Sequence, residues 1–200
     1  DLRMSRGLGD VYKRQTITYP TVISGIDNPV AVSRGKNHNL VLDINGDVWG
    51  WGSNSNYPMG RGAGKIRTAS KLSGISNVQQ IAAGTEFSLF LKKDGTVWSV
   101  GVNTYGQLGL GDTERRLDPE RIPSLSEVEK ISVGEDYALA LTSDGLYSWG
   151  RNNRWQLGDG TNEMCTAPKK ISVELEDGEE IIDISAGCLL YTSPSPRDMR

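Results

Sequence analysis

The chain has 200 residues, of which 22 are Lys or Arg and 25 are Asp or Glu, and its formal net charge is −3 at pH 7. This acidic balance argues against a nucleic-acid partner, because binding to phosphates needs clustered Lys and Arg. A basic protein partner stays open. No apolar run approaches the roughly 18 residues that a membrane helix requires, so we expect no membrane insertion.

The two ends of the chain differ from the rest. One possible coding string for residues 5–15 has a reverse complement that, read one base later, encodes residues 188–197. The string resembles a transposase adapter used in sequencing-library preparation. We therefore interpret 1–15 and 188–200 as adapter-derived tails and exclude them from fold reasoning. The segment 16–187 keeps 16 basic and 22 acidic residues, a net charge near −6.

Within that segment one unit is used three times. The three copies cover 35–62, 84–111 and 134–160, each opening on a glycine, and the opening glycines are 49 and 50 residues apart. A fourth unit begins at 184–187. Self-similarity at this period is typical of solenoids and propellers, in which each unit buries its apolar face against its neighbours.

Each unit is predicted to open with a short apolar strand that ends before its leading glycine. These first strands are 30–33, 78–82, 128–133 and 181–185. A second strand follows, in which leucines recur at period two, as in a half-buried strand. These second strands are 39–43, 88–92 and 138–142.

An Asn-Gly or Asp-Gly pair then predicts a type I′ turn, which closes each second strand into a hairpin with a third. The third strands are 48–51, 97–100 and 146–149. Their large aromatic residues share one face and are expected to lie in the core between stacked sheets. These aromatics are Trp49, Trp98 and Tyr147.

After each hairpin comes an asparagine and then an apolar residue before glycine, which predicts a tight loop anchored by the apolar side chain. The asparagines are Asn54, Asn103 and Asn152. The connectors that follow, 61–76, 112–127 and 161–180, are polar and vary in length. We expect their prolines, Pro119, Pro123 and Pro168, to break regular structure, and the connectors to present one variable face.

At these residues the chain resembles a known family. The segments GQLGLGD (106–112), WQLGDGT (155–161), DGTVW and SWGRN are similar to repeats of the regulator of chromosome condensation family. The resemblance implies an all-β propeller, of which this chain holds three blades and the start of a fourth, out of seven in the full-length protein. The first unit departs from the pattern, because Tyr57 stands where Gly106 stands.

Two motifs that can suggest ligand sites are better explained by structure. The segment 43–47 looks like part of a calcium loop, but an EF-hand has its glycine at position six and a Glu at twelve, and here Gly is fourth. The glycines of 109–111 and 158–160 are not followed by the helix that a phosphate cradle needs. We therefore predict turns at all three places.

Single reactive residues are interpreted in the same way. His38 shares its register position with Phe87 and Tyr137, which indicates packing rather than catalysis. Cys165 is the only cysteine outside the tails, so no disulfide can form, and we expect a loop or packing thiol. The connector that carries Arg115, Arg116 and Arg121 is a candidate contact for an acidic partner.

The sequence therefore predicts a protein-interaction scaffold and not an enzyme. We expect no catalytic, cofactor-binding or metal-binding residues, no cofactor, and a protein partner. The resemblance also implies two alternatives: a guanine-nucleotide exchange factor, since the founding member acts so on the small GTPase Ran, and a hydrolase inhibitor, since a bacterial member of the fold caps β-lactamases. The repeats look most like those of bacterial surface or secreted members, which favours an extracellular or cell-surface location.

Overall fold

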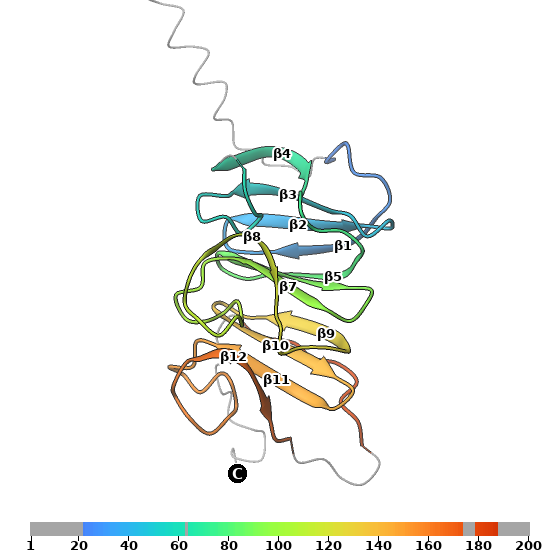
Figure 1. Ribbon diagram of the computed structural model, residues 1–200. Coiled ribbons are helices and arrows are strands. Elements are labelled where there is room, and N and C mark those ends of the chain that lie inside the picture. Colours follow the sequence, from blue (N-terminus) through green and yellow to red (C-terminus); the bar gives the residue numbers. More distant parts are fainter. Residues whose placement is uncertain (1–21, 63, 174–178, 188–200) are drawn as a thin grey trace, which may run out of the picture.

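The structure is a computed structural model that describes residues 22–62, 64–173 and 179–187, so both predicted tails, 1–15 and 188–200, lie outside the described residues. In that part of the chain twelve β-strands form three four-stranded antiparallel sheets (Figure 1). Each sheet is one repeat unit. The all-β class and the three-blade propeller architecture are confirmed.

The three sheets, or blades, have the same strand order. The first blade contains β1 (Pro29–Arg34), β2 (His38–Asp43), β3 (Val48–Ser53) and β4 (Lys65–Lys71). The second contains β5 (Val78–Ala83), β6 (Phe87–Lys92), β7 (Val97–Gly101) and β8 (Arg116–Arg121). The third contains β9 (Val128–Val133), β10 (Tyr137–Thr142), β11 (Gly145–Gly150) and β12 (Cys165–Ile171).

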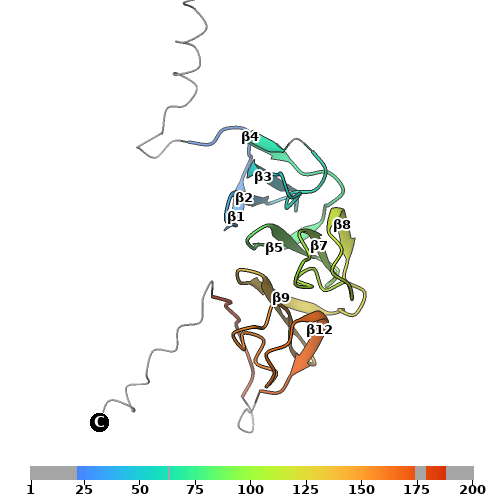
Figure 2. The same cartoon turned by 90° about the vertical axis from the view of Figure 1, so that its left-hand side faces the viewer.

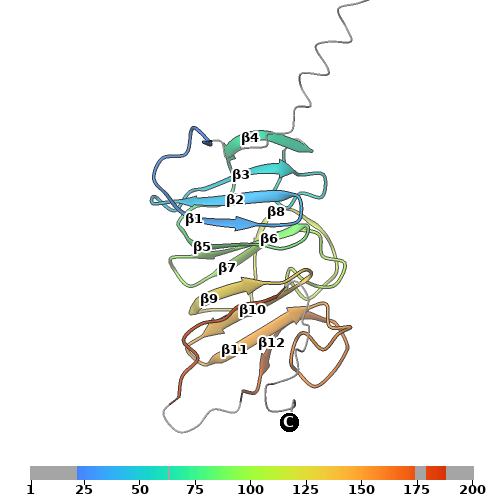
Figure 3. The ribbon, with the colours of Figure 1, turned by 180° about the vertical axis from the view of Figure 1, so that it is seen from behind.

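The blades follow one another along a curved stack. The inner strands β1, β5 and β9 lie toward the concave side, and the outer strands β4, β8 and β12 lie toward the convex side (Figure 2). The view from behind shows the same succession from β4 at one end to the third blade at the other (Figure 3). Each internal boundary therefore presses one sheet face against the next.

The predicted hairpins between the second and third strands are confirmed, but their turns are not of type I′. In the first blade the Gly46 N–H donates to the Asp43 carbonyl at 3.0 Å, and the Asp43 N–H donates to the Asp47 carbonyl at 3.0 Å. This is a three-residue loop in which the glycine, with φ of 85°, takes the left-handed position. The second blade repeats the pattern at Gly95, which has φ of 75°.

The prediction that the connectors lack regular structure is wrong. Each connector contains the outer strand of its blade, and β8 and β12 even include Pro119 and Pro168. Both prolines lie where the register shifts, between the pairs Ser99–Glu120 and Gly101–Arg116 in the second blade and the corresponding pairs in the third. Proline lacks an N–H, so it is tolerated at such a bulge on an edge strand.

The predicted opening strand of a fourth blade, 181–185, does not appear as a strand within the described residues 179–187. The segment nevertheless lies against β9 as β5 lies against β1. The Ala186 N–H donates to Ser132 Oγ at 2.9 Å, and the equivalent Ala83 N–H donates to Ser33 Oγ at 3.0 Å. A strand needs a hydrogen-bonded neighbour, and in the other blades that neighbour is the following hairpin.

The core consists of two apolar layers, one at each boundary between blades. The first boundary joins Leu40, Leu42, Val48 and Met59 of the first blade to Ile81, Phe90 and Val100 of the second. The second boundary joins Leu89, Leu91, Val97 and Leu108 of the second blade to Ile131, Ala140 and Trp149 of the third. Burial of these faces is what holds one unit to the next.

The aromatics expected in the core, Trp49, Trp98 and Tyr147, are only half-buried. Trp98 and Tyr147 pack on the rims of the two apolar layers. Their polar ends explain this position, because each bonds to its own hairpin turn: Trp49 Nε1–H donates to Asp43 at 3.0 Å, Trp98 Nε1–H to Thr96 at 3.2 Å, and the Tyr147 hydroxyl to Asp144 at 3.2 Å. Among the described residues, the fully buried Phe, Tyr and Trp side chains are Phe87, Phe90 and Trp149.

Candidate interaction surface

The leading glycine of each unit makes room for a ring three residues later. A Cβ on Gly84 would lie 2.0 Å from the Phe87 ring, and a Cβ on Gly134 would lie 2.0 Å from the Tyr137 ring. The glycine N–H also donates to the carbonyl of the ring residue, at 2.9 Å in both blades. The leading glycine therefore leaves the space that the ring of its own turn occupies.

His38 is the ring residue of the first blade, and its predicted packing role is confirmed. It is 1% exposed, and its Nε2 lies 3.1 Å from Ser88 Oγ of the second blade. The Ser88 hydroxyl donates to the Pro58 carbonyl at 2.6 Å, so its oxygen is available to accept from the His38 Nε2–H. Burial lowers the pKa of His38 from 6.5 to about 4, so the ring is neutral at pH 7.

The apolar residue predicted to anchor the loop after each third strand is buried in all three blades, and the asparagine, for which no such role was predicted, also holds the loop. Asn103 Oδ1 accepts from the Leu108 N–H at 2.9 Å, while Asn103 Nδ2 donates to the Asp112 carbonyl at 2.9 Å. Asn54 and Asn152 bond in the same way to Met59 and Leu157. All three asparagines are 1% exposed. These buried amides fix the loop backbone, so side chains on the loops are presented from a rigid frame.

These loops gather at one end of the stack, which lies on the left in Figure 1. We call this end the loop face. It comprises the turns between first and second strands and the longer loops between third and outer strands. The segments are 34–37, 83–86, 133–136, 54–64, 102–115 and 151–164. The opposite end carries the hairpin turns and the connections between blades. The connectors were predicted to present one variable face, but each of them crosses from one end of the stack to the other.

A cavity of about 490 Å³ opens on the loop face where the three inner strands end. Its lining includes Arg34 and Lys36 from the first blade, Thr85 from the second and Glu135 from the third. The first blade thus contributes positive charge and the third negative charge. Burial and the neighbouring Glu135 raise the pKa of Asp136, although Arg151 lies 3.3 Å away.

Two cation–π contacts cross the blade boundaries on the loop face. The Arg115 guanidinium lies 5.5 Å from the centre of the Tyr57 ring, and the Arg151 guanidinium lies 4.9 Å from that of Tyr105. In both pairs the aromatic comes from one blade and the arginine from the following blade. Such contacts stabilise by about 0.5–1 kcal/mol at exposed sites, and here they join loops of neighbouring blades.

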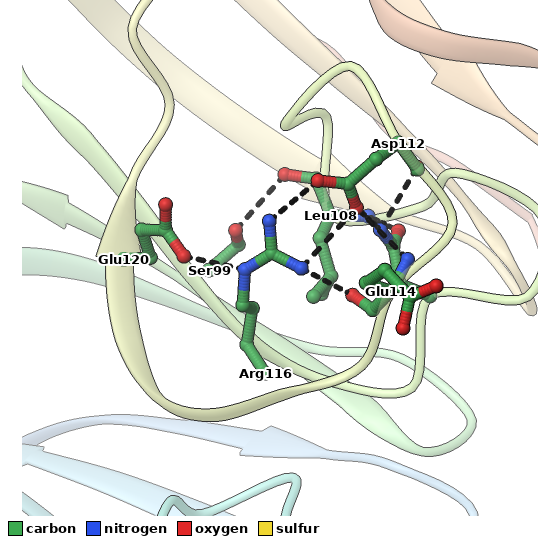
Figure 4. A network of polar contacts seen from close by, with 7 residues as sticks. Ser99, Leu108, Asp112, Glu114, Arg116 and Glu120 are labelled. Carbon is green, nitrogen blue, oxygen red and sulfur yellow. Dashed lines mark hydrogen bonds and ion pairs between the residues drawn. The ribbon is translucent and has the colours of Figure 1, made fainter.

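The three arginines of the connector that was a candidate contact for an acidic partner have different surroundings in the structure. Arg116 turns inward and forms ion pairs with Asp112, at 2.6 Å, and with Glu120; it also donates to the Glu114 carbonyl at 2.7 Å (Figure 4). Hydrogen bonds from Arg116 hold the pKa of Asp112 below its usual range, despite an opposing effect of burial. Arg115 and Arg121 are exposed, but Arg121 is the last residue of β8 and pairs with Trp98 near the hairpin turn, away from the loop face.

The turn at 43–47 is a hairpin turn, as predicted, and Asp43 holds it closed. Its Oδ1 accepts from the N–H groups of Asn45 and Asp47 at 3.0 and 2.9 Å. Its Oδ2 accepts from Trp49 Nε1–H. Among the described residues no group of three or more His, Cys, Asp and Glu side chains is placed to hold a metal ion.

The glycine-rich stretches are turns as well. The Gly109 N–H donates to the Gly106 carbonyl, and the Gly111 N–H to the Thr166 carbonyl, both at 2.9 Å. These N–H groups are engaged and do not point at a common anion site. Cys165 is a free, half-buried thiol whose Sγ lies 3.0 Å from the Ala167 carbonyl. In the part of the chain that the structure describes, no helix has the length and hydropathy of a membrane span.

Sequence reasoning missed one feature of the loop face. Tyr57 and Trp155, which share a register position with Gly106, have left-handed backbones with φ of 61° and 55°. Aromatic residues rarely adopt that conformation, and Trp155 is also 65% exposed. The signal was present in the alignment of the units, since a glycine in one copy marks a positive φ in the others.

Comparison with known proteins finds the same repeat. A family model of the regulator of chromosome condensation (RCC1) repeat matches residues 45–91, 94–141 and 143–189. A second model of that repeat matches 30–57, 78–107 and 128–156. Each match of the second model lies within one blade, whereas the first two matches of the first model each cover the last two strands of one blade and the first two of the next.

Several curated proteins are similar in sequence. The chain is 37% identical over 97 residues to the human E3 ubiquitin-protein ligase HERC2, covering 46% of this chain and 2% of that protein. It is 41% identical over 86 residues to the ultraviolet-B receptor UVR8 of Arabidopsis thaliana, covering 42% and 19%. It is 33% identical over 195 residues to the mitochondrial RCC1 domain-containing protein RUG3 of the same plant, covering 89% and 44%. The chain thus spans less than half the length of each.

Solved structures share the fold. Human WBSCR16 superposes with a TM-score of 0.69 at 27% identity, over 80% of this chain and 42% of that one. Yeast RCC1 (Prp20), solved with Kap60 bound, superposes with a TM-score of 0.57 at 23% identity, over 80% and 52%. Both similarities extend over most of the described residues.

Proposed function

This chain belongs to the regulator of chromosome condensation (RCC1) repeat family, and from that premise we propose that it is a protein-binding scaffold whose loop face receives a protein partner. The observation that carries the proposal is that the loop backbones are held in the same way in every blade, whereas the side chains that they expose differ. Buried asparagines and cation–π pairs fix the loops, while their exposed side chains differ from blade to blade. Recognition residues concentrate on loops that a rigid scaffold positions.

The relatives support a binding role rather than one shared reaction. A ubiquitin-protein ligase and an ultraviolet-B receptor both carry the repeat, although their named activities differ. Yeast RCC1 (Prp20) was solved with a protein, Kap60, bound to it. A fold that occurs in proteins with different functions does not determine the function. The function depends on the chemical groups that each protein presents on the surface of the fold. We therefore propose no catalytic role for this segment.

The cavity on the loop face gives the proposal a location. Arg34 and Lys36 are exposed on one side of it, and Glu135 lies on the other. A partner with a complementary charge pattern would be oriented by these groups, since charge complementarity contributes to specificity and to the rate of association.

The proposal is tested with one variant on each end of the molecule. The full chain is immobilised, and proteins that bind it from an extract of the source organism are identified. Lys36→Glu should abolish capture of the specific partner. Lys93→Glu, the matched exposed lysine in the hairpin turn at the opposite end, should leave it unchanged. Equal capture by both variants, or loss with Lys93→Glu alone, rejects the loop face as the site.

The alternative activities have their own assays. An exchange factor would accelerate release of a fluorescent guanine nucleotide from a small GTPase, and the acceleration would be lost in Lys36→Glu. An inhibitor would form a stoichiometric complex with a hydrolase and abolish its turnover. A captured partner that shows neither effect supports the scaffold.

A further inference from the structure

At both internal boundaries the outer strand of one blade covers the loop of the blade before it. At the first boundary, Arg61 of the loop pairs with Asp118 of β8 at 2.7 Å, and Arg115, next to β8, lies over Tyr57. At the second boundary, the Gly111 N–H of the loop donates to the carbonyl of Thr166 in β12 at 2.9 Å. Covering by an outer strand is therefore a regular feature of the repeat.

The two covered loops differ at the register position that is glycine in the second blade. A Cβ on Gly106 would lie 2.5 Å from Thr166 Cα, so β12 itself fills the space of a side chain. In the first loop this position is Tyr57, and its ring contacts the Arg115 guanidinium of the following blade. The loop residue therefore matches the strand that covers it. Gly106 allows the backbone of β12 to approach closely, and Tyr57 contacts a cation next to β8.

Trp155 occupies this position in the loop between β11 and β12. These strands belong to the third blade, which lies at the end of the stack opposite the first blade (Figure 1). Trp155 has the left-handed backbone of Tyr57 and is 65% exposed, and none of the cation–π contacts among the described residues involves its ring. Asn152 holds the loop as Asn54 holds the first one. The third loop is therefore shaped like a covered loop of the aromatic kind.

We propose that Trp155 is the anchor of a docking site for the outer-strand segment of another repeat of this type, one that presents Arg or Lys at the position of Arg115. Tryptophan is the best of the aromatic side chains for binding a cation. A glycine-type covering strand such as β12 would clash with the indole, since at Gly106 even a Cβ has no room. The occupant is a repeat of the same kind, so the inference stands apart from the partner proposed for the loop face.

The chain itself supplies the probe. A capped peptide of residues 113–121 carries Arg115 and all of β8, and it is titrated into the full chain labelled with 5-fluorotryptophan. The fluorine resonance of Trp155 is assigned from the variant Trp155→Tyr. We expect a saturable shift of that resonance, with an affinity on the order of millimolar or tighter. The native site for this segment, on the first loop, is already occupied by β8.

Two substitutions make the test specific. A peptide with Arg115→Ala should bind at least about threefold more weakly, because an exposed cation–π contact is lost. The protein variant Trp155→Tyr should still bind the peptide by calorimetry, and Trp155→Gly should not, with circular dichroism confirming that both variants are folded. The proposal is overturned if no saturable shift occurs, if both peptides bind equally, or if Trp155→Gly binds as well as the wild type.

Discussion

His38, Phe87 and Tyr137 fill one register position with three different rings, and only the imidazole can gain a proton near neutral pH. Phe87 is wholly apolar, and the Tyr137 hydroxyl donates to the Gly187 carbonyl at 3.0 Å. His38 instead reaches Ser88 across the first boundary. The boundary between the first two blades therefore depends on a neutral histidine.

We predict that the stability of the chain falls as pH decreases from 6.5 toward 4. Burial lowers the pKa of His38 to about 4, so between these values the unfolded state binds a proton that the folded state does not. The stabilisation is complete above the unfolded pKa and is lost as pH falls toward the folded one, by about 3 kcal/mol in total. Urea unfolding at pH 4.5 and pH 7.5 measures it.

The control is His38→Phe, which introduces the ring that the second blade uses at this position. It should remove most of the difference between the two pH values, because carboxylates titrate equally in both proteins. If His38→Phe shows the same loss as the wild type, the acid sensitivity has another source.

Trp155 is strained by its backbone, which leads to a prediction about stability that is independent of any ligand. A left-handed conformation costs an ordinary residue about 1–2 kcal/mol and costs glycine little. Since the indole is 65% exposed, little burial is lost on its removal. Trp155→Gly should therefore raise the free energy of unfolding by up to about 1 kcal/mol. Trp155→Ala keeps the strain and should not be stabilising; a destabilised Trp155→Gly would refute the argument.

At the scale of the element, the turn between first and second strands is built around the contact of glycine with a ring. We predict that Gly84→Ala destabilises the chain by about 3 kcal/mol, since the new Cβ would lie 2.0 Å from the Phe87 ring and the overpacked turn must shift. Gly111→Ala is the comparison: no atom lies within 4 Å of its Cβ, and only its φ of 87° is unfavourable.

Denaturant unfolding of the two variants separates crowding from backbone strain. Gly111→Ala should cost about 1 kcal/mol, the expense of a left-handed alanine. Equal losses in Gly84→Ala and Gly111→Ala would mean that the ring moves aside and that the glycine is not needed for packing.

Elements differ in how well the sequence predicted them. The inner hairpins were predictable because apolar alternation and an Asn-Gly or Asp-Gly pair act locally. The outer strands were not, because β8 and β12 tolerate Pro119 and Pro168 at bulges that only the neighbouring strand reveals. The type I′ turn predicted for the hairpins was also wrong. The hairpin loop of the first blade has three residues instead of two, and only the pairing of Asp43 with Asp47 reveals the third one.

At the scale of the whole molecule, the period of 49 and 50 residues predicted three stacked blades, because every copy must bury the same face. The candidate surface was less predictable. Arg115 and Arg116 look alike in sequence, yet Arg115 lies over a ring of the preceding blade and Arg116 forms ion pairs with carboxylates of its own blade. That difference arises from contacts between distant segments, which no local pattern encodes.

The stack also leaves an apolar face exposed, and we predict its consequence for the chain in solution. Val32 is 70% exposed, while the residues at the same register position in the next blades, Ile81 and Ile131, are 7% and 2% exposed. An apolar face that the repeat is built to cover should bind a hydrophobic dye and promote association. We expect enhanced fluorescence of such a dye and a mass that rises with concentration in sedimentation.

Val32→Lys should reduce both signals by placing a charge on that face. Ile44→Lys is the matched control, because Ile44 is 62% exposed but lies in a hairpin turn, away from the stacking surface. The expected order of dye fluorescence is wild type, then Ile44→Lys, then Val32→Lys. A chain that is monomeric at all concentrations, melts cooperatively and binds no dye would show that the exposed face of the first blade needs no cover. The stacking of like units would then not be what stabilises the blades.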